Sequence, residues 1–137
     1  MLETHDTFFT VVGCMDGRIQ EVMARFGREK FGAEYPDTIT EAGIVGMIAD
    51  NPDSKFVENL KFKLLVSIEK HHSKGIVVDG HKECAGNPVS DEKHREDIRK
   101  SVELIRILID SKVPVTGAFV IREGNVWKAE EIQLLNN

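Results

Sequence analysis

Three residues of the chain have the side chains and the spacing of a metal site. His81 and Cys84 are three positions apart in a stretch that follows the apolar run 76–78, and Cys14 likewise follows the apolar run 8–13. Zinc prefers thiolate and imidazole ligands, and a catalytic zinc site keeps three protein ligands and an open fourth position. Cys14, His81 and Cys84 are therefore a candidate zinc site. Two small buried cysteines and a histidine that caps a turn would explain the same residues equally well.

A carboxylate and a guanidinium group come directly after the first candidate ligand. Asp16 and Arg18 could form a bidentate ion pair, which would hold Asp16 ionised and fix the direction of its free oxygen. That oxygen could accept the proton of a metal-bound water in a hydrogen bond, or the carboxylate could move onto the metal as a fourth ligand, so the pair could act as a switch. An ordinary salt bridge at the first turn of a helix is the alternative.

The residues around the candidate ligands have less specific patterns. Gly80, Gly86 and Asn87-Pro88 allow close backbone approach, and the amide of Gly86 could bind an anionic substrate or product, although a turn requirement explains these residues as well. Other histidines and charged residues are expected to face solvent, with proton relay as the alternative for the histidines. They are His71, His72, His94, Lys82 and Glu83.

Alternating strand and helix patterns surround these residues. Continuous or β-branched apolar runs predict strands at 8–13, 37–42, 76–79, 115–121 and 126–132, the last two joined by a hairpin turn at 122–125. Helical spacing predicts helices over 19–26, ending at Gly27, from Ser54 to about His71-His72, and from Ser90 to about Ile109. Residues 43–52 are expected to be a loop with at most one helical turn.

This pattern predicts an α/β fold in a single domain covering residues 1–137. Right-handed crossovers give a sheet of four parallel strands in the order 2-1-3-4, with one antiparallel edge strand and helices on both faces. A site that joins Cys14 and His81 requires the first and third strands to be neighbours. The two side chains then meet at the carboxyl ends of parallel strands, where open sheets of this kind bind their ligands.

Composition excludes several classes of partner. The chain has 137 residues, with 18 Lys and Arg against 23 Asp and Glu, so its net charge is -5 and its basic residues are scattered. This argues against nucleic acid and anionic lipid as partners. No apolar stretch approaches the ~20 residues that cross a bilayer, and residues 1–6 lack the features of a signal peptide, so we expect a cytoplasmic protein. The two cysteines could form a disulfide, but a reducing compartment favours metal ligation.

The order of these motifs resembles a known family. Cys14-x-Asp16-x-Arg18 followed by His81-x-x-Cys84 is similar to the zinc signature of the β-class carbonic anhydrases. The apolar strand before each motif and the long amphipathic helix ahead of the second one resemble that family as well, and the similarity covers residues 10 to about 132. The sequence Cys-Ala-Gly-Asn-Pro at 84–88 replaces the commoner Cys-Gly and resembles a short, divergent branch described as "putative carbonic anhydrases".

The resemblance implies a function for each matched position. It implies zinc on Cys14, His81 and Cys84, with Asp16 and Arg18 as the catalytic dyad that orients a zinc-bound hydroxide. The implied enzyme is a carbonate dehydratase-type zinc lyase that reversibly hydrates carbon dioxide to bicarbonate, assembled as at least a homodimer with active sites at subunit boundaries. Two other functions stay open: hydrolysis of another small heterocumulene, carbonyl sulfide or carbon disulfide, and a non-catalytic zinc or thiol sensor module.

The chain also departs from the family pattern. Only a few residues precede the first strand, where the family has helices that wrap the partner subunit. Thr40-Glu41-Ala42-Gly43-Ile44 stands where the family often has Arg-Asn-Ala-Gly-Asn, which changes the wall of the pocket or the dimer contact. We expect zinc binding to survive these changes more securely than carbon dioxide hydration.

Overall fold

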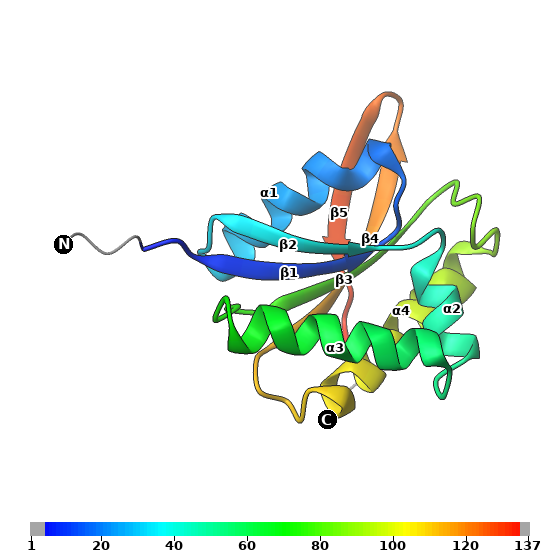
Figure 1. Ribbon diagram of the computed structural model, residues 1–137. Coiled ribbons are helices and arrows are strands. Elements are labelled where there is room, and N and C mark those ends of the chain that lie inside the picture. The colour runs from blue at the N-terminus through cyan, green and yellow to red at the C-terminus, as the bar shows by residue number, and fades with distance from the viewer. Residues whose placement is uncertain (1–4, 135–137) are drawn as a thin grey trace.

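The computed structural model of the chain describes residues 5–134, which form five strands and four α-helices (Figure 1). The strands are β1 (Phe8–Gly13), β2 (Tyr35–Thr40), β3 (Ile76–His81), β4 (Val115–Glu123) and β5 (Val126–Glu131). The helices are α1 (Gln20–Phe31), α2 (Ile44–Asp50), α3 (Lys55–Glu69) and α4 (Asp91–Leu108), and a 3-10 turn, Gly17–Ile19, precedes α1.

The five strands form one sheet in the order β2-β1-β3-β4-β5. β1 pairs in parallel with β2 and β3, β3 pairs in parallel with β4, and β5 runs antiparallel to β4. Val12 of β1 lies opposite Val78 of β3, so the carboxyl ends of these strands reach the same edge of the sheet. The predicted α/β sheet, its order and its antiparallel edge strand are confirmed.

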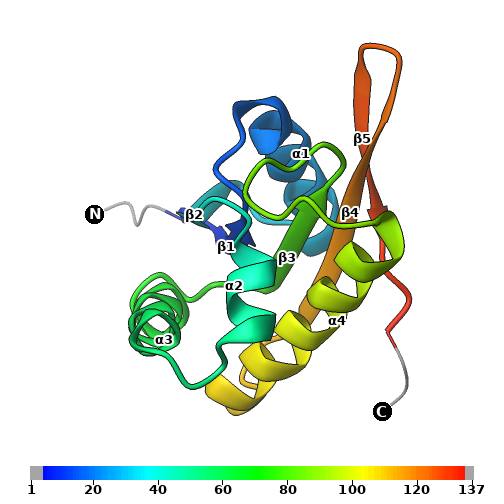
Figure 2. The ribbon, with the colours of Figure 1, turned by 90° about the vertical axis from the view of Figure 1, so that its right-hand side faces the viewer.

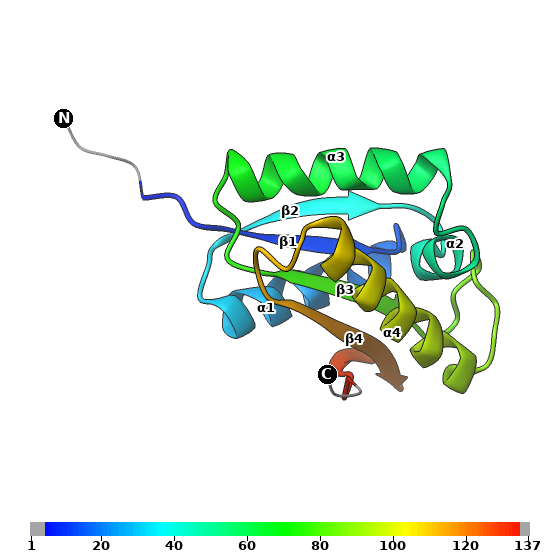
Figure 3. The same ribbon diagram turned by 90° about the horizontal axis from the view of Figure 1, so that it is seen from below.

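Helices cover both faces of the sheet, as predicted. Figure 2 shows α1 on one side and α2, α3 and α4 on the other, and Figure 3 shows α4 crossing in front of β3 and β4. The central strand β3 contributes to both cores, because Val78 packs toward α2 to α4 while Val77 packs toward α1. A strand covered on both faces has to be continuously apolar, which explains the pattern of 76–78.

The predicted end of the first helix at Gly27 is wrong. α1 continues to Phe31 and ends at Gly32, whose φ of 64° gives the left-handed cap that glycine adopts at low cost. Gly27 is buried inside the helix, and a Cβ atom there would lie 1.9 Å from the ring of Phe9 on β1. Glycine is therefore needed at position 27 because helix and strand approach closely, and its presence does not mark a helix end.

The segment predicted as a loop, 43–52, contains the helix α2. Gly43 has a φ of 60° and turns the chain into α2, whose residues Ile44, Val45 and Ile48 are buried. Seven residues are too few to establish a helical period, and the two glycines in this segment favour a loop. The sequence pattern therefore does not reveal this helix.

Several other element bounds differ from the predictions by one to three residues. β2 begins two residues earlier than predicted, at Tyr35, and includes Pro36, which an edge strand tolerates because its outer amides need no partner. α3 ends at Glu69, before the predicted end at His71-His72. Within residues 5–134, no helix is both long enough and apolar enough to span a bilayer.

Candidate metal centre

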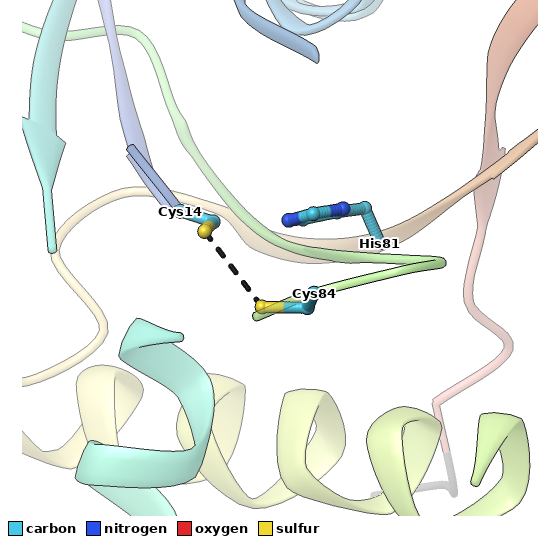
Figure 4. A group of neighbouring side chains, drawn as sticks. All are labelled: Cys14, His81 and Cys84. Atoms are coloured by element: carbon cyan, nitrogen blue, oxygen red, sulfur yellow. Dashed lines mark hydrogen bonds between the residues drawn. The ribbon is translucent and has the colours of Figure 1, made fainter. Parts of the chain in front are cut away.

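The sheet brings the three candidate ligands to one place. Cys14 follows the last residue of β1, His81 is the last residue of β3, and Cys84 lies on the loop after β3. Because β1 and β3 are parallel neighbours, their ends deliver all three side chains to the carboxyl edge of the sheet. Their potential ligand atoms lie within 4.8 Å of one another, and Figure 4 shows the three side chains facing a common point.

The distance between the two sulfur atoms suits a shared zinc ion. Cys14 Sγ and Cys84 Sγ are 3.8 Å apart. Two Zn–S bonds of about 2.3 Å at the tetrahedral angle place the sulfurs about 3.8 Å apart. The sulfurs are not bonded to each other, and both residues are buried. The fold thus spaces the two thiols for one tetrahedral ion.

The His81 ring is oriented so that its Nε2 atom could bind a metal. Its Nδ1 lies 2.7 Å from the carbonyl oxygen of Lys82, which can only accept, so Nδ1 donates and holds the hydrogen. Nε2 then carries a free lone pair, and this buried atom has no hydrogen-bond partner among the described residues. A backbone carbonyl that fixes the tautomer is the usual support of a metal-binding imidazole. This unpartnered Nε2 atom supports a fit between a metal ion and the three side chains of Cys14, His81 and Cys84.

The two thiols differ in acidity. Burial would raise the pKa of Cys14, but interaction with the His81 ring and with backbone amides outweighs it and lowers the pKa to about 7. One of these amides belongs to Gly43, whose N–H donates to Cys14 Sγ over 3.4 Å. Burial, followed by the charge on Cys14, raises the pKa of Cys84. Cys14 is thus the thiol that ionises first, and binding of a metal would favour deprotonation of Cys84.

Asp16 and Arg18 form the ion pair that their spacing suggested. Arg18 Nη2 donates to Asp16 Oδ2 over 2.6 Å, and Arg18 Nε donates to Asp16 Oδ1 over 3.0 Å. These hydrogen bonds lower the pKa of Asp16 to about 2. Asp16 Oδ2 also lies 3.9 Å from His81 Nε2, so the carboxylate stands beside the candidate metal ligands while paired with Arg18. Gln20 supports this segment by donating to the carbonyl oxygens of Cys14 and Asp16.

Asp79 is a site residue that the sequence analysis did not single out. Its side chain is 1% exposed, and its Oδ1 accepts a hydrogen bond from the backbone N–H of Cys14 over 3.1 Å. Burial raises the pKa of Asp79 to about 7. Its carboxylate also occupies the space that a side chain at Gly13 would need. A single acid at the end of an otherwise apolar strand was the signal that could have identified it.

The prediction that His94 is solvated is wrong. His94 is 3% exposed, its ring packs toward Phe119 and His81, and its Nε2 has no hydrogen-bond partner among the described residues. Burial, followed by the charge that His81 carries when it is protonated, lowers the pKa of His94. Its neighbours Asp91, Glu92 and Glu96 are exposed, which is why the charged sequence around His94 suggested exposure.

The loop between β3 and α4, residues 82–90, carries Cys84 and is here called the ligand loop. It is anchored to α4. Asn87 Nδ2 donates to Asp97 Oδ2 over 3.1 Å, and Asp97 is 1% exposed and also pairs with Lys93. Gly86 lies against the backbone of Ala42, where a Cβ atom would be 2.6 Å from the Ala42 carbonyl carbon. Close packing therefore accounts for glycine at 86, and its contact with an anionic substrate stays a prediction.

The comparisons with known proteins agree with this architecture. A family model described as "Putative carbonic anhydrase" matches residues 4–133. Among solved structures, β-carbonic anhydrase isoform I from Trichomonas vaginalis is 18% identical, with a TM-score of 0.58 over 94% of this chain and 86% of that one. Carbonic anhydrase from Streptococcus mutans is 18% identical, with a TM-score of 0.59 over 88% and 80%.

A third similar structure is one of two tetrameric β-carbonic anhydrases from Sordaria macrospora. It is 14% identical, with a TM-score of 0.58 over 93% of this chain and 84% of that one. At these identities, the similarity shows a shared fold. No curated protein matches the sequence.

Proposed function

The chain belongs to the family described as "Putative carbonic anhydrase", and on that premise we propose that it catalyses the reversible hydration of carbon dioxide to bicarbonate. The observation that carries this proposal is the convergence of Cys14, His81 and Cys84 beside the paired Asp16 and Arg18. A metal held by such ligands would make water a nucleophile at neutral pH, and the oriented carboxylate would direct that water.

We propose that Cys14, His81 and Cys84 hold a zinc ion. The 3.8 Å between the sulfurs, the free lone pair on His81 Nε2 and the lowered pKa of Cys14 support this choice. When bound, zinc supplies a Lewis acid that lowers the pKa of a water molecule from 15.7 to about 7.

Asp16 orients the nucleophilic water in this proposal. Its pKa of about 2 keeps the carboxylate ionised at neutral pH, so both oxygens act as hydrogen-bond acceptors. Arg18 occupies one side of the carboxylate and fixes its direction. The oxygen of this water then attacks the carbon of carbon dioxide, and one C=O electron pair moves onto a carbon dioxide oxygen. Loss of a proton from the attacking water leaves bicarbonate. The released proton goes to solvent or buffer, because a carboxylate with so low a pKa does not retain it.

The same arrangement favours an enzyme over a non-catalytic module. A structural zinc site is normally closed by four protein ligands, whereas three donor atoms converge here. An ion pair beside the donors has no evident use in a purely structural site. We further propose at least a homodimer, in line with the tetrameric description of the Sordaria macrospora proteins, and a reducing cytoplasmic location in which the thiols stay available.

Zinc content and stopped-flow hydration of carbon dioxide on the purified protein test the proposal. We expect about one zinc per chain and hydration well above the buffer rate. Zinc-loaded protein that is no faster than buffer would remove the proposed reaction. Parallel assays with carbonyl sulfide and carbon disulfide would then show whether the site acts on another heterocumulene.

A further inference from the structure

Arg18 is held by more than Asp16. Its Nη1 donates to Glu83 Oε1 over 3.1 Å and its Nη2 donates to the Glu83 carbonyl oxygen over 3.2 Å. The guanidinium carbon also lies 4.8 Å from the centre of the Trp127 ring, within cation–π range. Arg18 therefore has two sets of contacts, one to the carboxylate beside the metal centre and one to residues that the proposed reaction does not use.

The second set of contacts joins two separate parts of the fold. Glu83 lies on the loop between His81 and Cys84, whereas Trp127 lies on the hairpin formed by β4 and β5. Arg122 of that hairpin donates to the same Glu83 Oε1 over 2.8 Å and also lies over the Trp127 ring, 4.9 Å from its centre. The Trp127 ring in turn meets the His81 ring edge-on at 6.3 Å.

The Glu83 carboxylate bridges two positively charged side chains. Arg18 and Arg122 both bind its Oε1 and both lie against one indole ring, so without the carboxylate the two guanidinium groups would repel each other. The contacts are partly exposed, and single exposed ion pairs contribute little. Four charges linked through Asp16, Arg18, Glu83 and Arg122, with an aromatic ring beneath them, form a network that fixes geometry more strongly than one pair does.

The left-handed backbone conformation of Glu83 indicates that its side chain is required at this position. Its φ is 61°, in the left-handed region that a side chain with a Cβ atom adopts at a cost and that glycine adopts freely. The turn between the two candidate ligands would accommodate glycine more easily. The glutamate at this strained position instead reaches both arginines.

We propose that Glu83 and Trp127 are positioning residues that hold Arg18, so that Asp16 stays paired with Arg18 and does not occupy the open position at the metal. The inference rests on the proposed function of this site. Asp16 Oδ2 is already 3.9 Å from His81 Nε2, so the carboxylate is near enough to compete for that position once Arg18 is released. The group of residues Glu83, Arg122 and Trp127 is named the Arg18 clamp.

Two substitutions at position 83 separate this role from a role in folding. Glu83→Gln keeps the shape of the side chain and removes the charge, and Glu83→Gly removes the side chain together with the left-handed strain, so it should fold at least as well as the parent. Glu123→Gln is the matched control, because Glu123 is an exposed acid on the same hairpin whose side chain pairs with Lys128 and not with the charged groups of the clamp.

The metal-free protein gives the first readout. Trp127 is the single tryptophan of the chain, so its emission reports on the two guanidinium groups that lie over it. We expect both Glu83 variants to shift the emission to longer wavelength as the ring becomes more exposed, and Glu123→Gln to leave it unchanged. Emission identical to the parent in both Glu83 variants would contradict the clamp.

The cobalt-substituted protein gives the second readout. Thiocyanate titrated against the visible spectrum of bound cobalt measures access to the open position. We expect the Glu83 variants to bind thiocyanate at least roughly tenfold more weakly, as the loss of a hydrogen bond between charged groups implies, because Asp16 takes that position. Adding Asp16→Asn to Glu83→Gln should restore the affinity. Unchanged affinity in the single variants, or no recovery in the double variant, would overturn the inference.

Failure of the proposed reaction is distinguishable from failure of the clamp. A parent protein that binds cobalt and thiocyanate but does not hydrate carbon dioxide contradicts the reaction alone, and the comparison of variants still tests the clamp. A parent protein that takes up no cobalt contradicts the metal centre and the inference together.

Discussion

Cys14 Sγ lies 3.8 Å from Cys84 Sγ, although 70 positions separate the two residues in the sequence. Each sulfur is delivered by its own strand end, and only the pairing of β1 with β3 brings them together. Because the free thiols already have the separation of two zinc ligands, little rearrangement should be needed for metal binding, and the centre should stabilise the folded chain as soon as zinc is present.

Zinc should therefore raise the melting temperature of the metal-free protein in a manner that depends on both cysteines. Saturation at a thousandfold the dissociation constant stabilises a folded chain by about 4 kcal/mol. We expect thermal unfolding of the parent to shift upward with zinc and that of Cys84→Ser to shift far less. An equal shift in the variant would show that zinc binds elsewhere.

Asp16→Asn should separate metal binding from catalysis. The amide keeps the size of the carboxylate but no longer accepts at both oxygens, so we expect carbon dioxide hydration to fall by roughly a hundredfold or more while zinc content stays near that of the parent. Asp53→Asn, at an exposed position before α3, is the control and should keep full activity. A fully active Asp16→Asn variant would contradict the role assigned to Asp16.

Asp97→Ala should destabilise the protein and loosen the loop that carries Cys84. The substitution leaves Asn87 without its buried acceptor, which costs about 2 kcal/mol in free energy of unfolding. Urea denaturation measures this loss, and a zinc titration should show weaker binding in the variant. Glu96→Gln, an exposed neighbour paired with Lys100, should leave both quantities nearly unchanged. Similar results for the two variants would mean that the anchor has no effect.

Gly27→Ala should destabilise the protein even though alanine favours helices more than glycine does. The added Cβ atom would lie 1.9 Å from the Phe9 ring, and overpacking of this kind costs about 1 to 3 kcal/mol. At Gly17 an added Cβ atom meets nothing within 4 Å, so Gly17→Ala should have little effect on stability. Chemical denaturation of both variants checks this, and a stable Gly27→Ala variant would contradict the close packing of α1 on β1.

The sheet was predictable because its signals are local and repeated. The continuous apolar runs of β1 and β3 indicated strands buried on both faces, and the motifs after them indicated one shared edge. Gly27 and Gly43 have no unique meaning in the sequence, because a glycine can end a helix, permit close packing or begin a helix from a left-handed turn. The sequence pattern does not distinguish these uses, since each depends on neighbours far away in the chain.

The candidate site was predictable only where motif residues carry it. The positions of Cys14, His81 and Cys84 followed from spacing and from the neighbouring strands, and the ion pair of Asp16 with Arg18 followed from their separation. The contacts of Glu83 with Arg122 and Trp127, and the burial of His94, come from the packing of α4 and the hairpin against the ligand loop. Such contacts have no spacing rule in sequence.

X-ray absorption at the zinc edge of the purified protein identifies the atoms that bind the metal. We expect two sulfur ligands at about 2.3 Å, one imidazole nitrogen at about 2.0 Å and one further light atom from solvent. A spectrum without sulfur ligands, or one with four protein ligands that include the Asp16 carboxylate, would contradict an open centre formed by Cys14, His81 and Cys84.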